Sequence, residues 1–144
     1  MGRAREWTAA LNQWSDAQPQ FTGAYSGLCR VHRAQLLQLG GGWHDAAREA
    51  KAASTAATQG YGALFIGAAF YQLAELHRLR GQTGAADDAY QRASQYGWGT
   101  QPGHALLRFT EGRRAAAVAA TRRALAETTD LQRRARLLPP TWRS

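Results

Sequence analysis

Apolar residues recur along this chain with the spacing of amphipathic helices. Trp7, Ala10, Leu11 and Trp14 stand at i, i+3, i+4 and i+7, so they share one face of a helix. Glycine and proline interrupt the pattern at intervals, where helices end. This pattern predicts seven helices, at residues 3–15, Thr22–Leu39, Asp45–Thr58, Ala63–Arg80, Thr83–Tyr96, His104–Glu111 and Arg114–Thr128.

Two of these helices carry a stripe of larger apolar residues, which we expect to face a core. In the helix over 63–80, Gly81 ends a continuous stripe made of Phe65, Ala69, Phe70, Leu73, Leu76 and Leu79. In the helix over 22–39, the residues expected inward are Leu28, Val31, Leu36 and Leu39.

Three segments share one repeat template: an alanine, a glycine seven residues later, an alanine five further and another seven further. The matches are Ala34-Gly41-Ala46-Ala53, Ala74-Gly81-Ala86-Ala93 and Ala105-Gly112-Ala117-Ala124. This spacing fits a helix, a tight turn and a second helix, with small residues where two helix backbones approach closely. Self-similarity at a period of roughly 20–50 residues is typical of solenoids. The pattern therefore predicts stacked helical hairpins, whose surface binds a partner rather than performing chemistry.

Composition supports an all-α fold. The chain has 144 residues, of which 44% are hydrophobic and 19% charged, as in a globular domain or a short repeat array. β-branched apolar residues are scarce, and alanine, leucine, arginine and glutamine are abundant, which favours helix over sheet. We expect about seven helices. Residues 1–128 are assigned to the helical repeat domain and residues 129–144 to a weak helix and a loose tail.

The net charge of +8 is carried almost wholly by arginine, since Lys51 is the only lysine. Most of the excess lies after residue 104. This basic end leaves two interpretations open, a solvated helix face or contact with nucleic acid or an acidic partner. Arg113-Arg114 and Arg122-Arg123 are nine residues apart, so on one helix they point in opposite directions and form no single stripe.

Sequence signals for catalysis or cofactors are weak. Cys29 is the only cysteine, and no two histidines are spaced as the ligands of a helical metal site would be. Gly60-x-Gly62 has Phe65 where a nucleotide loop needs a third glycine. Asp87-Asp88 fits the first turns of a helix better than paired acid–base work. We expect no enzyme, no metal and no cofactor.

No apolar run approaches the ~20 residues of a membrane span, and the first residues do not resemble a signal peptide. The sequence therefore predicts a cytoplasmic protein with no membrane partner.

Residues 70–93 resemble the tetratricopeptide repeat consensus through Phe70, Leu73, Ala74, Gly81, Ala86, Tyr90 and Ala93. Trp98 stands where that family usually has proline, and the flanking copies match less well. The resemblance implies a right-handed solenoid in which the first helix of each pair lines a concave groove for a protein or peptide. The groove positions would be Gln35, Gln38, Tyr71, Glu75 and Arg78, although these residues also fit an ordinary polar helix face. Self-association through an uncapped end is a further expectation.

Two stretches, Cys29–Leu39 and Ala69–Gly81, also resemble the repeat region of large LuxR-type ATP-binding transcriptional regulators from high-GC bacteria. In that family an ATPase and a helix-turn-helix flank or follow the repeats. This chain has no Gly-x-x-x-x-Gly-Lys-Ser/Thr motif, and no recognition-helix pattern follows residue 128. The resemblance thus implies an isolated repeat segment, or a truncated reading frame, with a regulatory binding role. The alternative function is that of a basic nucleic-acid-binding or transcription-associated helical domain.

Overall fold

The computed structural model describes residues 24–57 and 63–130, together with a few isolated positions outside these ranges. Over these two ranges the protein is all-helical, as the sequence predicted. The helices are α2 (Ala24–Leu39), α3 (Trp43–Ala57), α4 (Ala63–Leu79), α5 (Thr83–Gln95), α6 (Gly103–Thr110) and α7 (Arg114–Glu127). These are six rather than about seven. The helix expected at residues 3–15 lies largely outside the described residues, as does the segment after residue 130.

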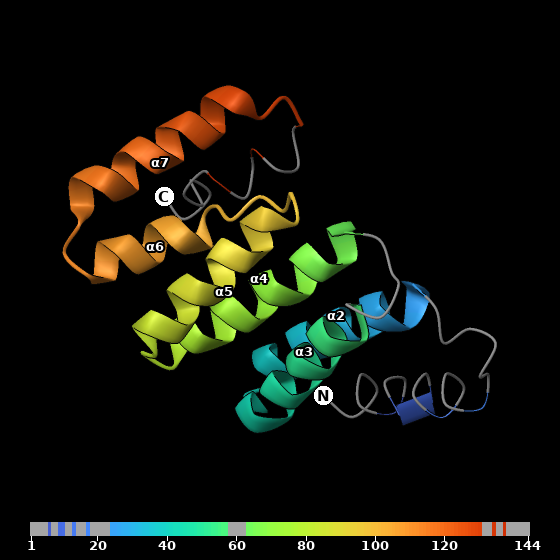
Figure 1. Cartoon of the computed structure of the whole chain (residues 1–144). Coiled ribbons are helices and arrows are strands. Elements are labelled where there is room, and N and C mark those ends of the chain that lie inside the picture. The colour runs from blue at the N-terminus through green and yellow to red at the C-terminus, as the bar shows by residue number, and fades with distance from the viewer. Residues whose placement is uncertain are drawn as a thin grey trace, which may run out of the picture.

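Consecutive helices pair into three hairpins, α2 with α3, α4 with α5 and α6 with α7 (Figure 1). Neighbouring hairpins are also in contact, because α4 packs against both α2 and α3, and α6 packs against both α4 and α5. Units that are adjacent in the sequence are therefore adjacent in space, and the predicted helical-hairpin arrangement is confirmed.

The three hairpin turns share one backbone geometry, which explains the glycine of the repeat template. Gly41, Gly81 and Gly112 have φ of +79°, +73° and +79°, a region that side chains with a Cβ rarely adopt. At the second turn, Gly81 N–H donates to Arg78 O at 3.0 Å and Gln82 N–H donates to His77 O at 2.9 Å. The same two bonds recur at the other turns, and they satisfy carbonyls that the helix end leaves free.

The alanines of the template lie where helices touch. Six of the nine are 0% exposed, namely Ala34, Ala46, Ala53, Ala74, Ala86 and Ala93. Leu76 of α4 packs into the cluster formed by Ala34, Ala46 and Ala50 of the preceding hairpin. Leu107 of α6 has the same position in its repeat, and it packs into the equivalent cluster around Ala74 and Ala86. The same contact between neighbouring hairpins, a leucine packed among alanines, therefore occurs twice.

Three of the leucines expected inward are exposed instead. Leu36 is 55%, Leu39 83% and Leu79 45% exposed. Leu36 is the counterpart of Leu76 and Leu107, but within residues 24–57 and 63–130 no hairpin precedes α2 to cover it. Leu39 and Leu79 both stand five residues after the first alanine of their repeat, at the last residue of a first helix.

Trp98, at the position where the resembled family has proline, packs over α4. A Cβ added to Gly67 would lie 2.6 Å from the Trp98 Cβ, so only glycine permits this close approach. The Trp98 ring lies against clusters that include Ala68, Ala69 and Phe70. The indole therefore covers one end of the α4–α5 hairpin, and the Gly81 turn lies at the other end.

Candidate functional site

Two of the five residues predicted to line a groove lie on α2. Gln35 is exposed, and its Oε1 is 3.1 Å from His32 Nδ1. Gln38 is half-buried, and its Oε1 accepts a 2.7 Å hydrogen bond from Nε2 of Gln72, which is buried on α4. Gln38 therefore links two first helices, whereas the amide of Gln35 faces solvent.

The other three predicted residues, Tyr71, Glu75 and Arg78, lie together on α4 and bond to their surroundings. Arg78 Nη2 donates to Glu75 Oε2 at 2.7 Å, and both side chains are only 16% exposed. The hydroxyl of Tyr90, from α5, donates to Glu75 Oε1. The Tyr71 ring meets the Tyr90 ring edge-on, with centroids 5.8 Å apart. The structure thus brings these residues together where α4 and α5 are in contact.

Burial and pairing with Glu75 shift the pKa values of Tyr90 and Arg78 at this contact. Burial, the hydrogen bond to Glu75 and the carboxylate charge all raise the pKa of Tyr90 well above its ordinary value. Burial lowers the pKa of Arg78, but the hydrogen bond and the attraction to Glu75 outweigh it, so the pKa is raised overall. The Tyr90 hydroxyl is held neutral, and the ion pair is largely compensated within the protein.

The repeat template identifies further exposed residues on the first helices, which the sequence analysis missed. Leu106 and Phe109 occupy in α6 the positions that Glu75 and Arg78 hold in α4, and they are 45% and 52% exposed. We call the exposed set Gln35, Leu39, Leu79, Leu106 and Phe109 the first-helix face. Aligning the three repeats would have found the two α6 residues, because they stand one and four residues after the template alanine.

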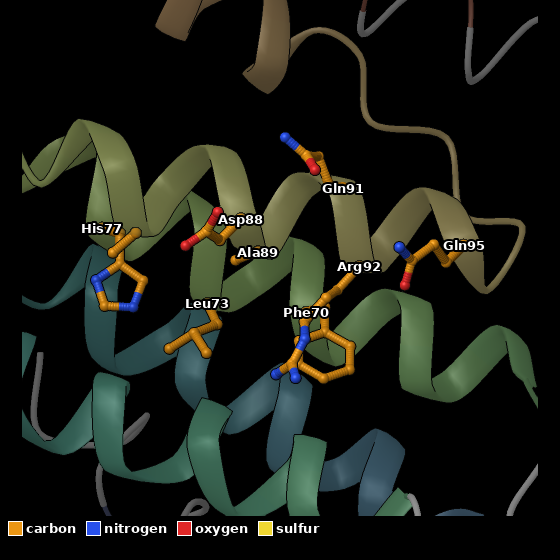
Figure 2. Close-up of a pocket in the computed structure, with 9 residues that line it drawn as sticks. Phe70, Leu73, His77, Asp88, Ala89, Gln91, Arg92 and Gln95 are labelled. Atoms are coloured by element: carbon orange, nitrogen blue, oxygen red, sulfur yellow. The ribbon is translucent and has the colours of Figure 1, made fainter.

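A second surface feature lies between α3, α4 and α5. Two adjoining hollows of about 450 Å³ each share the residues Phe70, Leu73, His77 and Arg92. Lys51 of α3 lines one of them and Asp88 of α5 lines the other. We call these hollows together the α3–α5 groove; Figure 2 shows the part beside α5. Its lining comes from the second helices α3 and α5 and from the side of α4 opposite Glu75, and the sequence analysis did not predict it.

The described residues also contain one close pair of histidine and carboxylate. His104 is 8% exposed, its Nε2 is 2.7 Å from Asp87 Oδ1, and its ring stacks on Tyr90 with centroids 5.0 Å apart. Burial raises the pKa of Asp87, but hydrogen bonds to His104 and Gln91 outweigh it, so the pKa is lowered overall. The pair joins α5 to α6.

Across residues 24–57 and 63–130 no cluster of three histidine, cysteine, aspartate or glutamate side chains could hold a metal ion. In the same part of the chain no helix has both the length and the apolar character needed to cross a bilayer.

No protein-family model matches this chain, and the searches of curated proteins and of solved structures found no match either.

Proposed function

We propose that this chain is a tetratricopeptide-like module that binds a protein segment on its first-helix face without catalysis. One observation carries the proposal: large apolar side chains stay exposed on all three first helices. These are Leu39, Leu79, Leu106 and Phe109, which range from 45% to 83% exposed. In stacked hairpins these side chains would share one face, and a contiguous exposed apolar face is typical of interaction surfaces.

The repeated packing supports a solenoid as the form of the module. The same turn geometry occurs three times, and the packing of Leu76 into the preceding hairpin recurs one hairpin later at Leu107. In a solenoid each unit contacts its neighbours in the same way, so first helices lie next to first helices. The contacts of α4 with α2 and with α6 agree with this arrangement.

The partner we propose is an amphipathic helix or an extended segment with apolar side chains. Its apolar residues would cover Leu79 and Phe109, and its polar groups would meet the solvent-exposed amide of Gln35. Glu75 and Arg78 would shape the surface rather than supply free charge, since they bond to each other. As the regulatory segment of a cytoplasmic transcriptional regulator, the module would report the presence of such a partner.

The test is to select peptides that bind the full chain from a displayed library, and to measure their affinity for variants. We expect Leu79→Glu and Phe109→Glu each to weaken binding at least about tenfold, because a buried carboxylate replaces an apolar anchor. Val118→Glu is the matched control. Val118 is 47% exposed on α7, outside the first-helix face, and this change should leave affinity unaltered.

Two results would contradict the proposal. The first is that every selected peptide binds the Leu79→Glu and Phe109→Glu variants as tightly as the original chain. The second is that the chain prefers nucleic acid, with an affinity that falls steeply between ~50 and ~200 mM salt. The second result would instead support the basic nucleic-acid-binding alternative.

A further inference from the structure

We propose that the α3–α5 groove is a second binding site, which takes an acidic peptide carrying a large apolar side chain. This site lies between α3 and α5, on the side of α4 opposite Glu75, and it does not depend on the function proposed for the first-helix face.

The floor of the groove is apolar. Phe70 is buried to 7% exposure and Leu73 is half-buried, and both line each of the two hollows. Each hollow has a volume of about 450 Å³, within the ~300–1,000 Å³ of pockets that hold small ligands. A leucine or phenylalanine side chain of a partner would therefore find both space and an apolar surface.

Cations stand on both sides of this floor. Lys51 rises from α3 and Arg92 from α5, and both are exposed. Within the described parts of the chain, neither forms an ion pair with a carboxylate. The Arg92 guanidinium lies over the Phe70 ring, 5.1 Å from its centroid. This stacking holds the guanidinium at the edge of the floor and leaves its N–H groups able to bind a carboxylate.

The remaining polar side chains make the two ends of the groove different. Figure 2 shows His77 and Asp88 at one end, Gln95 at the other, and Arg92 and Phe70 between them. His77 Nδ1 is 2.6 Å from Gln82 Oε1, so this imidazole already has a partner. Asp88 is the only carboxylate among the described residues that line the groove. A bound acidic segment would place its carboxylates toward Lys51 and Arg92, away from Asp88.

These charges favour a peptide over nucleic acid. Binding a phosphate backbone requires several cations that converge on one track. The groove offers Lys51 and Arg92 on either side of an apolar floor, and Asp88 would repel a phosphate at one end. Carboxylates that flank a large apolar residue match this arrangement better.

The experiment uses the full chain and a short fluorescent peptide of glutamates around a central phenylalanine, with binding followed by anisotropy. We expect Lys51→Glu and Arg92→Glu each to weaken binding roughly tenfold, as loss of a close charge partner does. Replacing the peptide's phenylalanine with serine should weaken binding as well. Both protein positions are exposed, so circular dichroism should show an unchanged fold.

The matched control is Arg123→Glu, which makes the same change of charge at an exposed position on α7. It should alter the affinity less than about twofold, because no residue of α7 lines either hollow and only screened long-range effects remain. The Leu79→Glu variant should also bind this peptide normally, which separates this site from the first-helix face.

Equal affinity of the Lys51→Glu, Arg92→Glu and Arg123→Glu variants would overturn the proposal, since general charge attraction would then explain binding. Binding that ignores the loss of the peptide's phenylalanine would overturn it too. So would an oligothymidylate that displaces the peptide and is itself weakened by the same two substitutions, because the groove would then bind nucleic acid.

Discussion

The hydroxyl of Tyr90 donates a hydrogen bond to the carboxylate of Glu75, a residue fifteen positions earlier on the partner helix of the same hairpin. The Tyr90 side chain is 0% exposed, and His104 of the next hairpin stacks on its ring. A Cβ added at Gly103 would overlap both the Glu75 carboxylate and the Tyr90 hydroxyl. One polar contact thus lies where α4, α5 and α6 meet.

Replacing Tyr90 with phenylalanine should lower the free energy of unfolding by about 1–3 kcal/mol, the usual effect of removing one partner of a buried hydrogen bond. Urea denaturation followed by circular dichroism measures it. Tyr96→Phe is the control, because it removes the same hydroxyl group from a tyrosine that is only half-buried. The Tyr96 ring stacks on Phe70, with centroids 5.9 Å apart. Equal stability of the two variants would show that the Glu75 contact contributes nothing.

Stability should fall as pH rises above about 10, the ordinary pKa of tyrosine. The folded state raises the pKa of Tyr90, so the folded chain binds a proton that the unfolded chain releases above that pH. This stabilisation is complete below pH 10 and is lost above it. Urea denaturation between pH 9 and pH 11 should show the fall in the original chain. A Tyr90→Phe variant with an equally steep fall would contradict this assignment.

Gly67→Ala should destabilise the protein by about 1–3 kcal/mol, because the added methyl group would press on Trp98. The matched control is Gly84→Ala in the first turn of α5, where a Cβ meets no atom within 4 Å. There alanine should be neutral or stabilise by up to ~1 kcal/mol through helix propensity. Thermal unfolding of both variants decides the matter, and a destabilised Gly84→Ala with a normal Gly67→Ala would refute the packing argument.

Gly81→Ala should reduce stability by about 1–2 kcal/mol, since an L-residue is strained at a φ of +73°. No atom lies within 4 Å of an added Cβ, so backbone conformation alone should account for the loss. Gly81→Asn should lose less, because asparagine tolerates the left-handed region better than alanine does. Chemical denaturation of the pair gives the comparison, and alanine proving the milder change would rule out this explanation.

Asp87→Asn should flatten the dependence of stability on pH in acid. The pKa of Asp87 is lowered in the folded state, so its contribution is present above about pH 4, the ordinary value for aspartate. It is lost as pH falls through the lower folded value. Urea midpoints between pH 2 and pH 6 test this, with Asp88→Asn, an exposed neighbour, as the control. If the Asp88 variant flattens the profile instead, the bond to His104 is not the cause.

The hairpins could be predicted from the sequence because their requirements are local. A glycine at positive φ and an alanine between two close helices are demanded by the backbone at particular positions. Gly81 and Ala74 therefore appear in the sequence at the spacing that the structure requires. Helix periodicity likewise located the helices to within a few residues.

The environment of individual side chains was less predictable. Leu36 and Leu76 look alike in the sequence, but Leu76 packs into a preceding hairpin, whereas Leu36 lies on the outer side of the first described one. Glu75 resembled a free groove residue, but Tyr90 and Arg78 bond to it. Burial and pairing depend on residues far away in the sequence, which periodicity does not report.

The amino-acid sequence alone thus determined the all-helical class, the three repeated hairpins and the positions of their turns, since each of these rests on interactions within a few residues. Only the tertiary structure decided which apolar residues remain exposed, which charges are compensated, and that Lys51 and Arg92 flank one apolar floor. Those properties depend on how separate helices approach each other, because solvent exposure and electrostatic pairing are set by neighbours in space.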